Sequence, residues 1–402
     1  MYQKRADISE STLIWIVGLI QFVNILDFMM VMPLGPDFAK ALQIPISDIG
    51  LIGGVYTFAA AFSGLIAALF IDQLPRKKVL IFCLIGLVLA TLSGAFAWDK
   101  ASMVGARILA GCFGGPLTAA AIALIADYVL PEKRGMAMGK VAGAFAAASV
   151  LGVPFGLELA SRISWHAPFV ATAGFGLLIT ILVAVKLPLH AAPSAARTIR
   201  QGLGHLLKML KSKTALMSYL FLGLTTMSGF MIIPNIASHL LMNLDYPREN
   251  LGILYFCGGS VSFFGMRFSG KIVDKYSATL ASSFFTITLL IAIGNGFVWF
   301  PTIMPIVAIF ILFMFSMTGR MIAAQTLSSK VPLPHERGAY MAVQTTTMHL
   351  FSALGAYLSS LILVEQGGKL LHVPTVGIVA MAIACAAPAL IYVVERRIKK
   401  AH

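Results

Sequence analysis

Residues 64–79 read GLIAALFIDQLPRKKV: an apolar segment runs down to Asp72, and a basic turn follows at residues 76–78. Charge at the edge of a membrane segment acts either as a topology anchor or as part of a switch. A second segment of this kind, GKIVDKY at residues 270–276, places Asp274 after another apolar run in the second half of the chain. The recurrence predicts a chain built from two related halves.

Composition indicates that most of the chain faces lipid. Hydrophobic residues make up 58% of the 402 residues, charged residues make up only 11%, and the mean hydropathy is +0.88. A transmembrane helix needs about 20 apolar residues, and these runs lack the alternation of barrel strands. The sequence therefore predicts an all-α membrane protein with about twelve transmembrane helices, near residues 13–36, 48–71, 78–98, 101–126, 138–160, 166–187, 215–241, 250–273, 279–300, 302–326, 338–363 and 373–395.

The net charge of +14 is distributed unevenly between the loops. If the amino terminus is cytoplasmic, the opposite side keeps few basic residues: Lys40, Lys100, Arg162, Arg248 and Lys369. Cytoplasmic loops are enriched in Lys and Arg. We therefore expect both termini in the cytoplasm of a bacterial-type inner (plasma) membrane. The basic side chains would then contact lipid headgroups, with no role in binding nucleic acid.

The sequence shows no pattern typical of enzymes or of metal sites. It has no nucleotide-binding glycine loop and no nucleophile–base signature. The first apolar run is too long for a secretory signal and is followed by no small-residue cleavage site. The cysteines lie in apolar runs without metal-ligand spacing, so we expect free thiols and no metal: Cys83, Cys112, Cys257 and Cys385.

Residues 1–187 and 214–402 are predicted to form two six-helix bundles, joined by a cytoplasmic linker at residues 188–213. The linker would contain a short basic amphipathic helix around residues 203–210, lying along the headgroups, with a disordered tether as the alternative. The loop PEKRG at residues 131–135 matches PHERG at residues 334–338, and Gly152 matches Gly355 downstream. Six helices per half predict a parallel repeat with the substrate cavity between the halves.

Twelve spans, a central loop and an acid-plus-basic turn after the second and eighth spans resemble the major facilitator superfamily. The chain is most similar to the twelve-span drug:proton antiporters and arabinose-efflux-like permeases. Asp72, Arg76 and Lys77 meet the family loop signature G-x-L-a-D-R-x-G-R-R, whereas Ala68 and Gln73 depart from it. The resemblance implies a monomeric secondary carrier that exports small amphipathic or drug-like compounds by proton antiport, using a proton gradient and no cofactor.

Two other functions stay open at this level. One is a metabolite or lysolipid uniporter, importer or flippase of the same fold, and the other is a membrane sensor without transport. The 20 Met and 27 Phe residues favour a broad apolar pocket. The side chains expected to line this cavity are Gln21, Asn24, Met30, Asn235, His239, Gln344 and His349. Arg267 and Arg320 are expected to reach the cytoplasmic headgroups.

The turn after the second span suggests a conformational latch. Asp72 and Arg76 are expected to contact Asp127 at the end of the fourth span when the cytoplasmic side is closed, with Asp274 as the counterpart in the second half. Such contacts bias one state of a two-state carrier. The alternative is that these cations only anchor topology.

A buried carboxylate is the candidate for proton coupling. Gln21, Asn24 and Asp27 recur at three-residue spacing and form one polar stripe on the first helix. Arg107, which lies inside the fourth span, needs a partner, and Asp27 is the expected one. Burial raises the pKa of a carboxyl group and a guanidinium lowers it, so helix movement can load or release a proton. A permanent structural ion pair is the alternative.

Two further features lie on the fifth span. Glu158 is a possible second proton-coupling acid, or it pairs with Arg162 one turn on. Gly152, Pro154 and Gly156 in GVPFG resemble the antiporter motif of the superfamily. Small residues allow close helix packing and proline bends the helix. Ordinary packing of small residues is the alternative interpretation.

Overall fold

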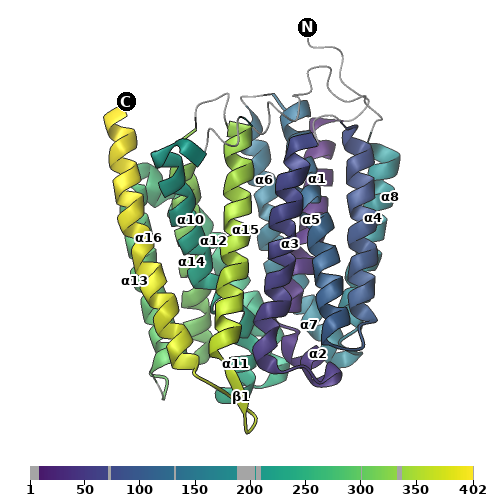
Figure 1. Ribbon diagram of the computed structural model, residues 1–402, viewed down its shortest axis with the longest axis vertical. Helices are drawn as coiled ribbons and strands as arrows, with labels where there is room; N and C mark the ends of the chain where they lie inside the picture. The colour runs from purple at the N-terminus through teal and green to yellow at the C-terminus, as the bar shows by residue number, and fades with distance from the viewer. Residues whose placement is uncertain are drawn as a thin grey trace.

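The computed structural model describes residues 9–70, 74–130, 133–187, 204, 210–299, 301–332 and 337–401. Within these ranges nearly all of the chain is helical, and long helices run side by side through the height of the molecule (Figure 1). α1 begins and α16 ends at one face, here called the termini face. The short helices α2 and α11 lie at the other, here called the α2–α11 face (Figure 1). An all-α membrane fold is confirmed.

The first group of helices precedes residue 188. Its elements are α1 (Glu10–Val31), α2 (Gly35–Leu42), η1 (Ile46–Asp48), α3 (Ile49–Phe70), α4 (Arg76–Ala95), α5 (Lys100–Tyr128), α6 (Arg134–Ala147), the π-helical segment η4 (Ala148–Gly152), α7 (Val153–Arg162) and α8 (Ala167–Lys186). The predicted linker helix falls almost entirely outside the described residues.

The second group follows residue 212. Its elements are α10 (Lys213–Phe230), η5 (Ile233–Asn235), α11 (Ile236–Asn243), η6 (Arg248–Asn250), α12 (Leu251–Lys275), α13 (Ala278–Ile293), the π-helical segment η7 (Gly294–Val298), α14 (Ile306–Ser328), α15 (Arg337–Ile362), β1 (Val364–Gln366), β2 (Lys369–Leu371) and α16 (Val373–Ala401). The strands form a small antiparallel hairpin on the α2–α11 face.

Ten helical spans among the described residues are long and apolar enough to cross a membrane. The two other predicted passages are α6–η4–α7, which a π-helical segment interrupts, and α15. The first and seventh passages break near the α2–α11 face, because each contains a proline that cannot donate a backbone hydrogen bond. Pro33 separates α1 from α2, and Pro234 lies between α10 and α11.

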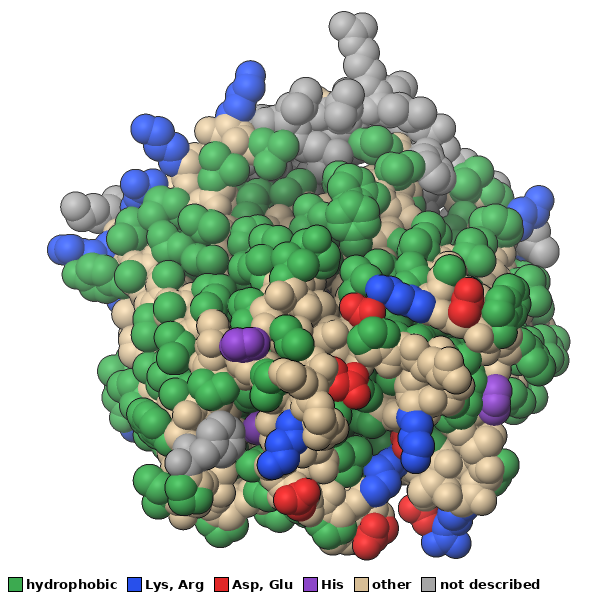
Figure 2. All heavy atoms as spheres, turned by 60° about the horizontal axis from the view of Figure 1, so that its bottom comes forward, with side chains coloured by type: hydrophobic (Ala, Val, Ile, Leu, Met, Phe, Trp, Pro, Cys, Tyr) green, Lys and Arg blue, Asp and Glu red, His purple; other side chains and the backbone are tan. Residues whose placement is uncertain are grey.

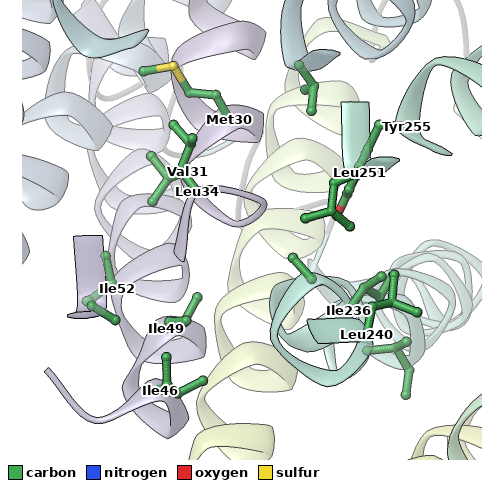
Figure 3. Packing of buried hydrophobic residues seen from close by; sticks show 14 of the residues in the cluster. Met30, Val31, Leu34, Ile46, Ile49, Ile52, Ile236, Leu240, Leu251 and Tyr255 are labelled. Carbon is green, nitrogen blue, oxygen red and sulfur yellow. The ribbon is translucent and has the colours of Figure 1, made fainter. Parts of the chain in front are cut away.

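The α2–α11 face is closed by apolar packing between the two groups. Figure 3 shows Met30, Val31 and Leu34 together with residues from α3 on one side of this cluster, and residues of α11 and α12 on the other. The large members contributed by the second group include Ile236 and Leu240, both nearly fully buried. Each Å² of apolar surface removed from water contributes about 25 cal/mol, so this packing stabilises the arrangement in which the α2–α11 face is closed.

Polar contacts join the two groups at the rim of this face, where acidic and basic side chains gather (Figure 2). Arg248 at the start of η6 binds Asp37 of α2 through two hydrogen bonds of 2.5 and 3.1 Å. The Ile46 backbone N–H donates to Glu365 of β1 at 2.8 Å. These two contacts, Arg248 with Asp37 and Ile46 with Glu365, are here called the clasp. They hold the two groups together on the closed face.

Two pairs of helices carry most of the remaining contact between the groups. α3 packs along α15, and α12 packs against η4 and α7. Glycines allow the close approach: a Cβ added at Gly50 would lie 2.5 Å from the Ala356 carbonyl oxygen, and one at Gly259 would lie 3.0 Å from the Ser149 backbone. These small-residue seams resemble the packing found between membrane helices in general.

Candidate functional site

Asp27 and Arg107 form a buried ion pair between α1 and α5. Arg107 Nη2 lies 2.6 Å from Asp27 Oδ2, and Nη1 lies 3.2 Å from Oδ1. The side chains are 0% and 1% exposed. Two charges removed from water in this way need good geometry and further hydrogen bonds to offset their desolvation. The two-point contact supplies part of that requirement.

Neighbouring helices complete the shell of this pair. The Thr91 hydroxyl of α4 lies 2.7 Å from Asp27 Oδ1, and the Arg107 guanidinium sits over the Tyr56 ring of α3, 5.1 Å from its centroid. An arginine over an aromatic face gains a cation–π interaction, which is stronger when water is absent. Four helices thus meet at one buried ion pair.

A chain of polar contacts extends from this pair along α1. The Tyr56 hydroxyl donates to Asn24 Oδ1 at 3.0 Å, and Asn24 Nδ2 donates to Thr118 Oγ1 at 2.9 Å and to the Gly114 carbonyl at 3.2 Å. Thr118 lies 3.4 Å from Gln21 Oε1. The structure therefore brings Gln21, Asn24, Asp27 and Arg107 together, as their spacing in the sequence suggested.

The position of Asp27 follows from local structure. It lies in the last two turns of α1, just before the break at Pro33. Arg107 lies two turns into α5, whose first turn is fixed by a capping box in which Asp99 accepts from the Ser102 N–H at 2.8 Å. The hydrogen bonds to Ser102 hold the pKa of the exposed Asp99 carboxyl below its usual value.

Arg320 is buried, and its predicted route to the headgroups is wrong. Its side chain on α14 is 0% exposed. Its nitrogens donate to Ser228 Oγ at 2.9 Å, Thr286 Oγ1 at 3.1 Å and the Ala384 carbonyl at 3.2 Å. Among the described residues, only neutral groups bind this guanidinium. Three hydrogen bonds, not snorkelling, satisfy it.

The Arg320 site is the counterpart of the Asp27 site in the internal repeat. Asp27 lies six residues before Pro33, and Ser228 lies six residues before Pro234. Each accepts from an arginine on the fourth membrane passage of its half. A threonine from the third passage completes each site: Thr91 donates to Asp27, and Thr286 accepts from Arg320. The second half has a hydroxyl where the first half has the acid. A proton can therefore change the charge in only one of these two sites.

The polar residues predicted to line the cavity from the second half lie apart from the Asp27 cluster. Asn235 donates to Ser359 Oγ at 3.0 Å, and His239 Nε2 lies 2.8 Å from the Gly296 carbonyl of η7. Gln344 accepts from Ser328 Oγ at 3.0 Å. Each is thus engaged by partners within its own group. His349 lies on α15, and its Nδ1 has no hydrogen-bond partner among the described residues.

Two predicted residues of the first half have different surroundings. Met30 is 1% exposed in the closing cluster, and Thr172 Oγ1 lies 3.3 Å from its sulfur. Glu158 is half exposed and forms an ion pair with Arg162 one turn on. Glu158 is therefore partly solvated and lies outside the buried unit around Asp27, and the pair with Arg162 is the alternative that the sequence offered.

The structure describes three of the four predicted latch residues. Asp72 lies outside the described residues. Arg76 at the start of α4 donates from Nε to Asp127 of α5 at 2.9 Å. This pair joins two helices of the first group, so it is not itself a contact between the groups. Asp274 is exposed near the end of α12.

The segment that resembles the antiporter motif lies at the seam between the groups. Gly152 ends the π-helical segment η4, and a Cβ added there would lie 2.6 Å from Leu26 Cδ1. Pro154 is in the first turn of α7, where a proline is tolerated. Gly156 has more room, because a Cβ added there would lie 3.8 Å from the Pro168 side chain. The motif therefore touches the turn of α1 that carries Asp27.

Sequence reasoning missed Thr91, Tyr56 and Thr118, which complete the polar cluster. Hydroxyl side chains are common in membrane helices, since they can bond to their own backbone, and they stand out poorly against an apolar run. The sequence points to these residues only indirectly. A buried Asp and Arg need more hydrogen-bond partners than they offer each other, so further polar side chains must lie nearby.

A protein-family model matches most of the chain. The model of the Major Facilitator Superfamily matches residues 17–356. Two Bacillus subtilis (strain 168) proteins described as uncharacterized MFS-type transporters are similar: YfhI, 26% identical over 84% of this chain and 83% of its own length, and YceJ, 23% identical over 85% and 87%.

Solved structures agree on the fold. A bacterial homolog of the human lysosomal transporter Spinster, in an inward-facing and unoccupied conformation, has a TM-score of 0.77 at 14% identity, over 98% of this chain and 99% of that one. The nucleoside transporter NupG (D323A mutant) also has a TM-score of 0.77, at 12% identity, over 95% and 99%. Members of the family are generally transporters and not enzymes. This chain therefore belongs to the Major Facilitator Superfamily and is a secondary transporter.

Proposed function

We propose that the protein exports small amphipathic or drug-like compounds in exchange for protons, by alternating access, with Asp27 as the group that carries the proton. The observation that supports this most directly is the fully buried ion pair of Asp27 and Arg107. Ionisable residues inside a membrane bundle mark ion and proton pathways. The carrier acts as a monomer among membrane lipids, with the proton gradient as its energy source and no cofactor.

Protonation of Asp27 would change the energetics of α1 and α5 together. An ionised Asp27 neutralises Arg107 across 2.6 Å. A protonated Asp27 leaves the guanidinium without a buried counter-charge, which is costly in a dry interior. Proton binding therefore favours any arrangement of α1 and α5 that gives Arg107 other partners or water. This is how a proton can bias a two-state carrier.

The neighbours of Asp27 connect it to the seam between the groups. Phe28 stacks on Tyr56 with centroids 5.1 Å apart, and on Phe230 of α10 at 5.9 Å. Leu26 packs against Gly152 of η4, which in turn contacts α12. A shift of this turn of α1 would therefore act on α10 and, through η4, on α12.

The aromatic stack also supports the proposed class of substrate. Phe28 and Phe230 come from opposite groups and meet beside the proton site, and the neighbouring Met29 and Met231 are flexible thioethers. Aromatic and Met-rich surfaces adapt to apolar ligands of different shapes. Planar amphipathic compounds suit such a surface, which opens when the groups rock apart.

Transport in proteoliposomes tests the proposal. Ethidium, a planar amphipathic dye, is loaded into vesicles with and without an imposed pH gradient. We expect gradient-driven dye movement with wild type, and with Asp27→Asn only exchange of labelled for unlabelled dye, independent of the gradient. Glu158→Gln, which removes an exposed acid, serves as the matched control and keeps the gradient dependence.

Equal dye movement by wild type with and without the gradient contradicts proton coupling and favours a uniporter. Absence of carrier-dependent movement for ethidium and for a panel of neutral and anionic amphipathic dyes contradicts the proposed class of substrate. Residual exchange by Asp27→Asn, together with a monodisperse profile in size-exclusion chromatography, separates lost coupling from misfolding.

A further inference from the structure

The Thr91 hydroxyl stands between two acceptors. Its Oγ1 lies 2.7 Å from Asp27 Oδ1 and 2.8 Å from the Leu87 carbonyl oxygen, one turn back on α4. Thr91 is 1% exposed. A hydroxyl has one hydrogen to donate and two lone pairs to accept with, so it can donate to only one of these oxygens at a time.

The two possible orientations of this hydroxyl match the two charge states of Asp27. When Asp27 is ionised, Thr91 donates to Oδ1. When a proton sits on Oδ1, the carboxyl O–H donates to Thr91 Oγ1, and the Thr91 hydrogen turns to the Leu87 carbonyl. The hydrogen bond between Asp27 Oδ1 and Thr91 Oγ1 is thus kept in both states with its direction reversed, which avoids the cost of an unsatisfied donor or acceptor at these two atoms.

The geometry around the carboxylate also selects the oxygen that takes the proton. Arg107 binds Oδ2 at 2.6 Å but Oδ1 only at 3.2 Å. Oδ1 is thus the oxygen with the weaker hold on the guanidinium, and it is the one beside Thr91. Proton uptake there breaks the longer Arg107 contact and leaves the shorter one in place.

The other groups packed around Asp27 do not offer this alternation. Arg107 from α5 and Tyr56 from α3 are the titratable side chains that face it among the described residues. From α8, Thr172 faces the same small space but lies against the Met30 sulfur at 3.3 Å. The described parts of α6, η4 and α7 bring no acid or base into hydrogen-bond contact with Asp27.

We propose that Thr91 is a positioning residue that stabilises both the ionised and the protonated form of Asp27 and directs the proton to Oδ1. This inference rests on the proposed function of Asp27 as the proton carrier. The ionised form gains more from Thr91, because a hydrogen bond to a charged acceptor is about twice as strong as one between neutral groups. Loss of the hydroxyl therefore favours protonation at a higher pH.

The test is an infrared titration of the Asp27 carboxyl in purified protein, assigned by its absence in Asp27→Asn. In Thr91→Val we expect the titration midpoint to rise by about one pH unit and the C=O stretch of the protonated form to move as its O–H loses its acceptor. Thr91→Ser keeps the hydroxyl and the wild-type midpoint. Thr180→Val is the matched control, because the Thr180 hydroxyl is buried and, among the described residues, bonds only to the Gly176 carbonyl.

A midpoint that stays unchanged in Thr91→Val, or that moves equally in Thr91→Ser, overturns the inference. The titration is read without substrate or gradient. Failure of the proposed function is seen separately, as dye transport by wild type that ignores the pH gradient while the Thr91-dependent titration persists. In proteoliposomes, Thr91→Val should shift the pH dependence of gradient-driven transport in the same direction as the spectrum.

Discussion

Breaking the ion pair of Asp27 and Arg107 from one side should be far more damaging than removing both charges. Both side chains are essentially inaccessible to solvent. Removing one partner of a buried pair typically costs about 3–5 kcal/mol, because the other charge stays buried without compensation. Asp27→Asn leaves the guanidinium in this state, and Arg107→Met leaves the carboxylate.

The double variant Asp27→Asn/Arg107→Met removes the stranded charge and keeps a side chain of similar length at position 107. Replacement of a buried pair by neutral groups is often close to neutral. We expect the double variant to lose about 1–2 kcal/mol, mainly from the Thr91 and Tyr56 contacts. The coupling energy of the cycle should therefore be at least about 4 kcal/mol.

The assay is equilibrium unfolding in mixed micelles of a mild detergent and SDS, followed by tryptophan fluorescence and repeated for all four proteins. Arg320→Met supplies the comparison, since its neutral partners leave no stranded charge behind, and its loss should be smaller than that of Arg107→Met. A double variant as unstable as the sum of the single variants would refute the reasoning that the two charges act as one neutral unit.

Three further predictions concern the repeat and the seams. Asp37→Asn weakens the partly exposed pair with Arg248, worth at most about 1 kcal/mol, so spin-label distances across the α2–α11 face should show up to about fivefold more of the open population; no change contradicts the clasp. Ser228→Asp places an acid at the position whose hydroxyl now lies 2.9 Å from Arg320 and should raise the unfolding midpoint in the same micelles, whereas a lower midpoint would show that the site cannot hold a second ion pair. Gly259→Val drives a side chain into the η4 backbone and should slow transport more than tenfold while the ligand-free fold survives; unchanged transport contradicts the role of this seam.

Much of the fold follows from the sequence because the bilayer sets it. Runs of about 20 apolar residues must form helices that satisfy their own backbone groups, so the twelve passages and the resemblance to the family follow from the sequence. The breaks near Pro33 and Pro234 are less predictable, because a proline in a membrane helix can kink it without ending it. The π-helical segments η4 and η7 have no pattern in the sequence at all.

The candidate site also has a part that the sequence predicts and a part that it does not. Asp27 and Arg107 were predictable as partners, since a deep acid and a deep base are rare and each needs the other. Arg320 was assigned to the headgroups because the sequence gives its approximate depth but not its neighbours. The hydroxyls of Ser228 and Thr286 and the Ala384 carbonyl, which lie on three other helices, become its partners only through tertiary packing.

The difference between the two halves limits where protons can act. Both halves hold a buried arginine on the fourth helix with a threonine from the third, but only the first half supplies an acid from the helix before its proline break. An arginine bound by hydroxyls and a carbonyl has a fixed charge across the physiological range. If transport is coupled to protons through these sites, the charge of the first half alone changes during the cycle. Under the proposed alternating access, movement of α1 against α5 would then drive the motion of the two groups relative to each other, and Phe28 and Phe230 lie where these groups meet.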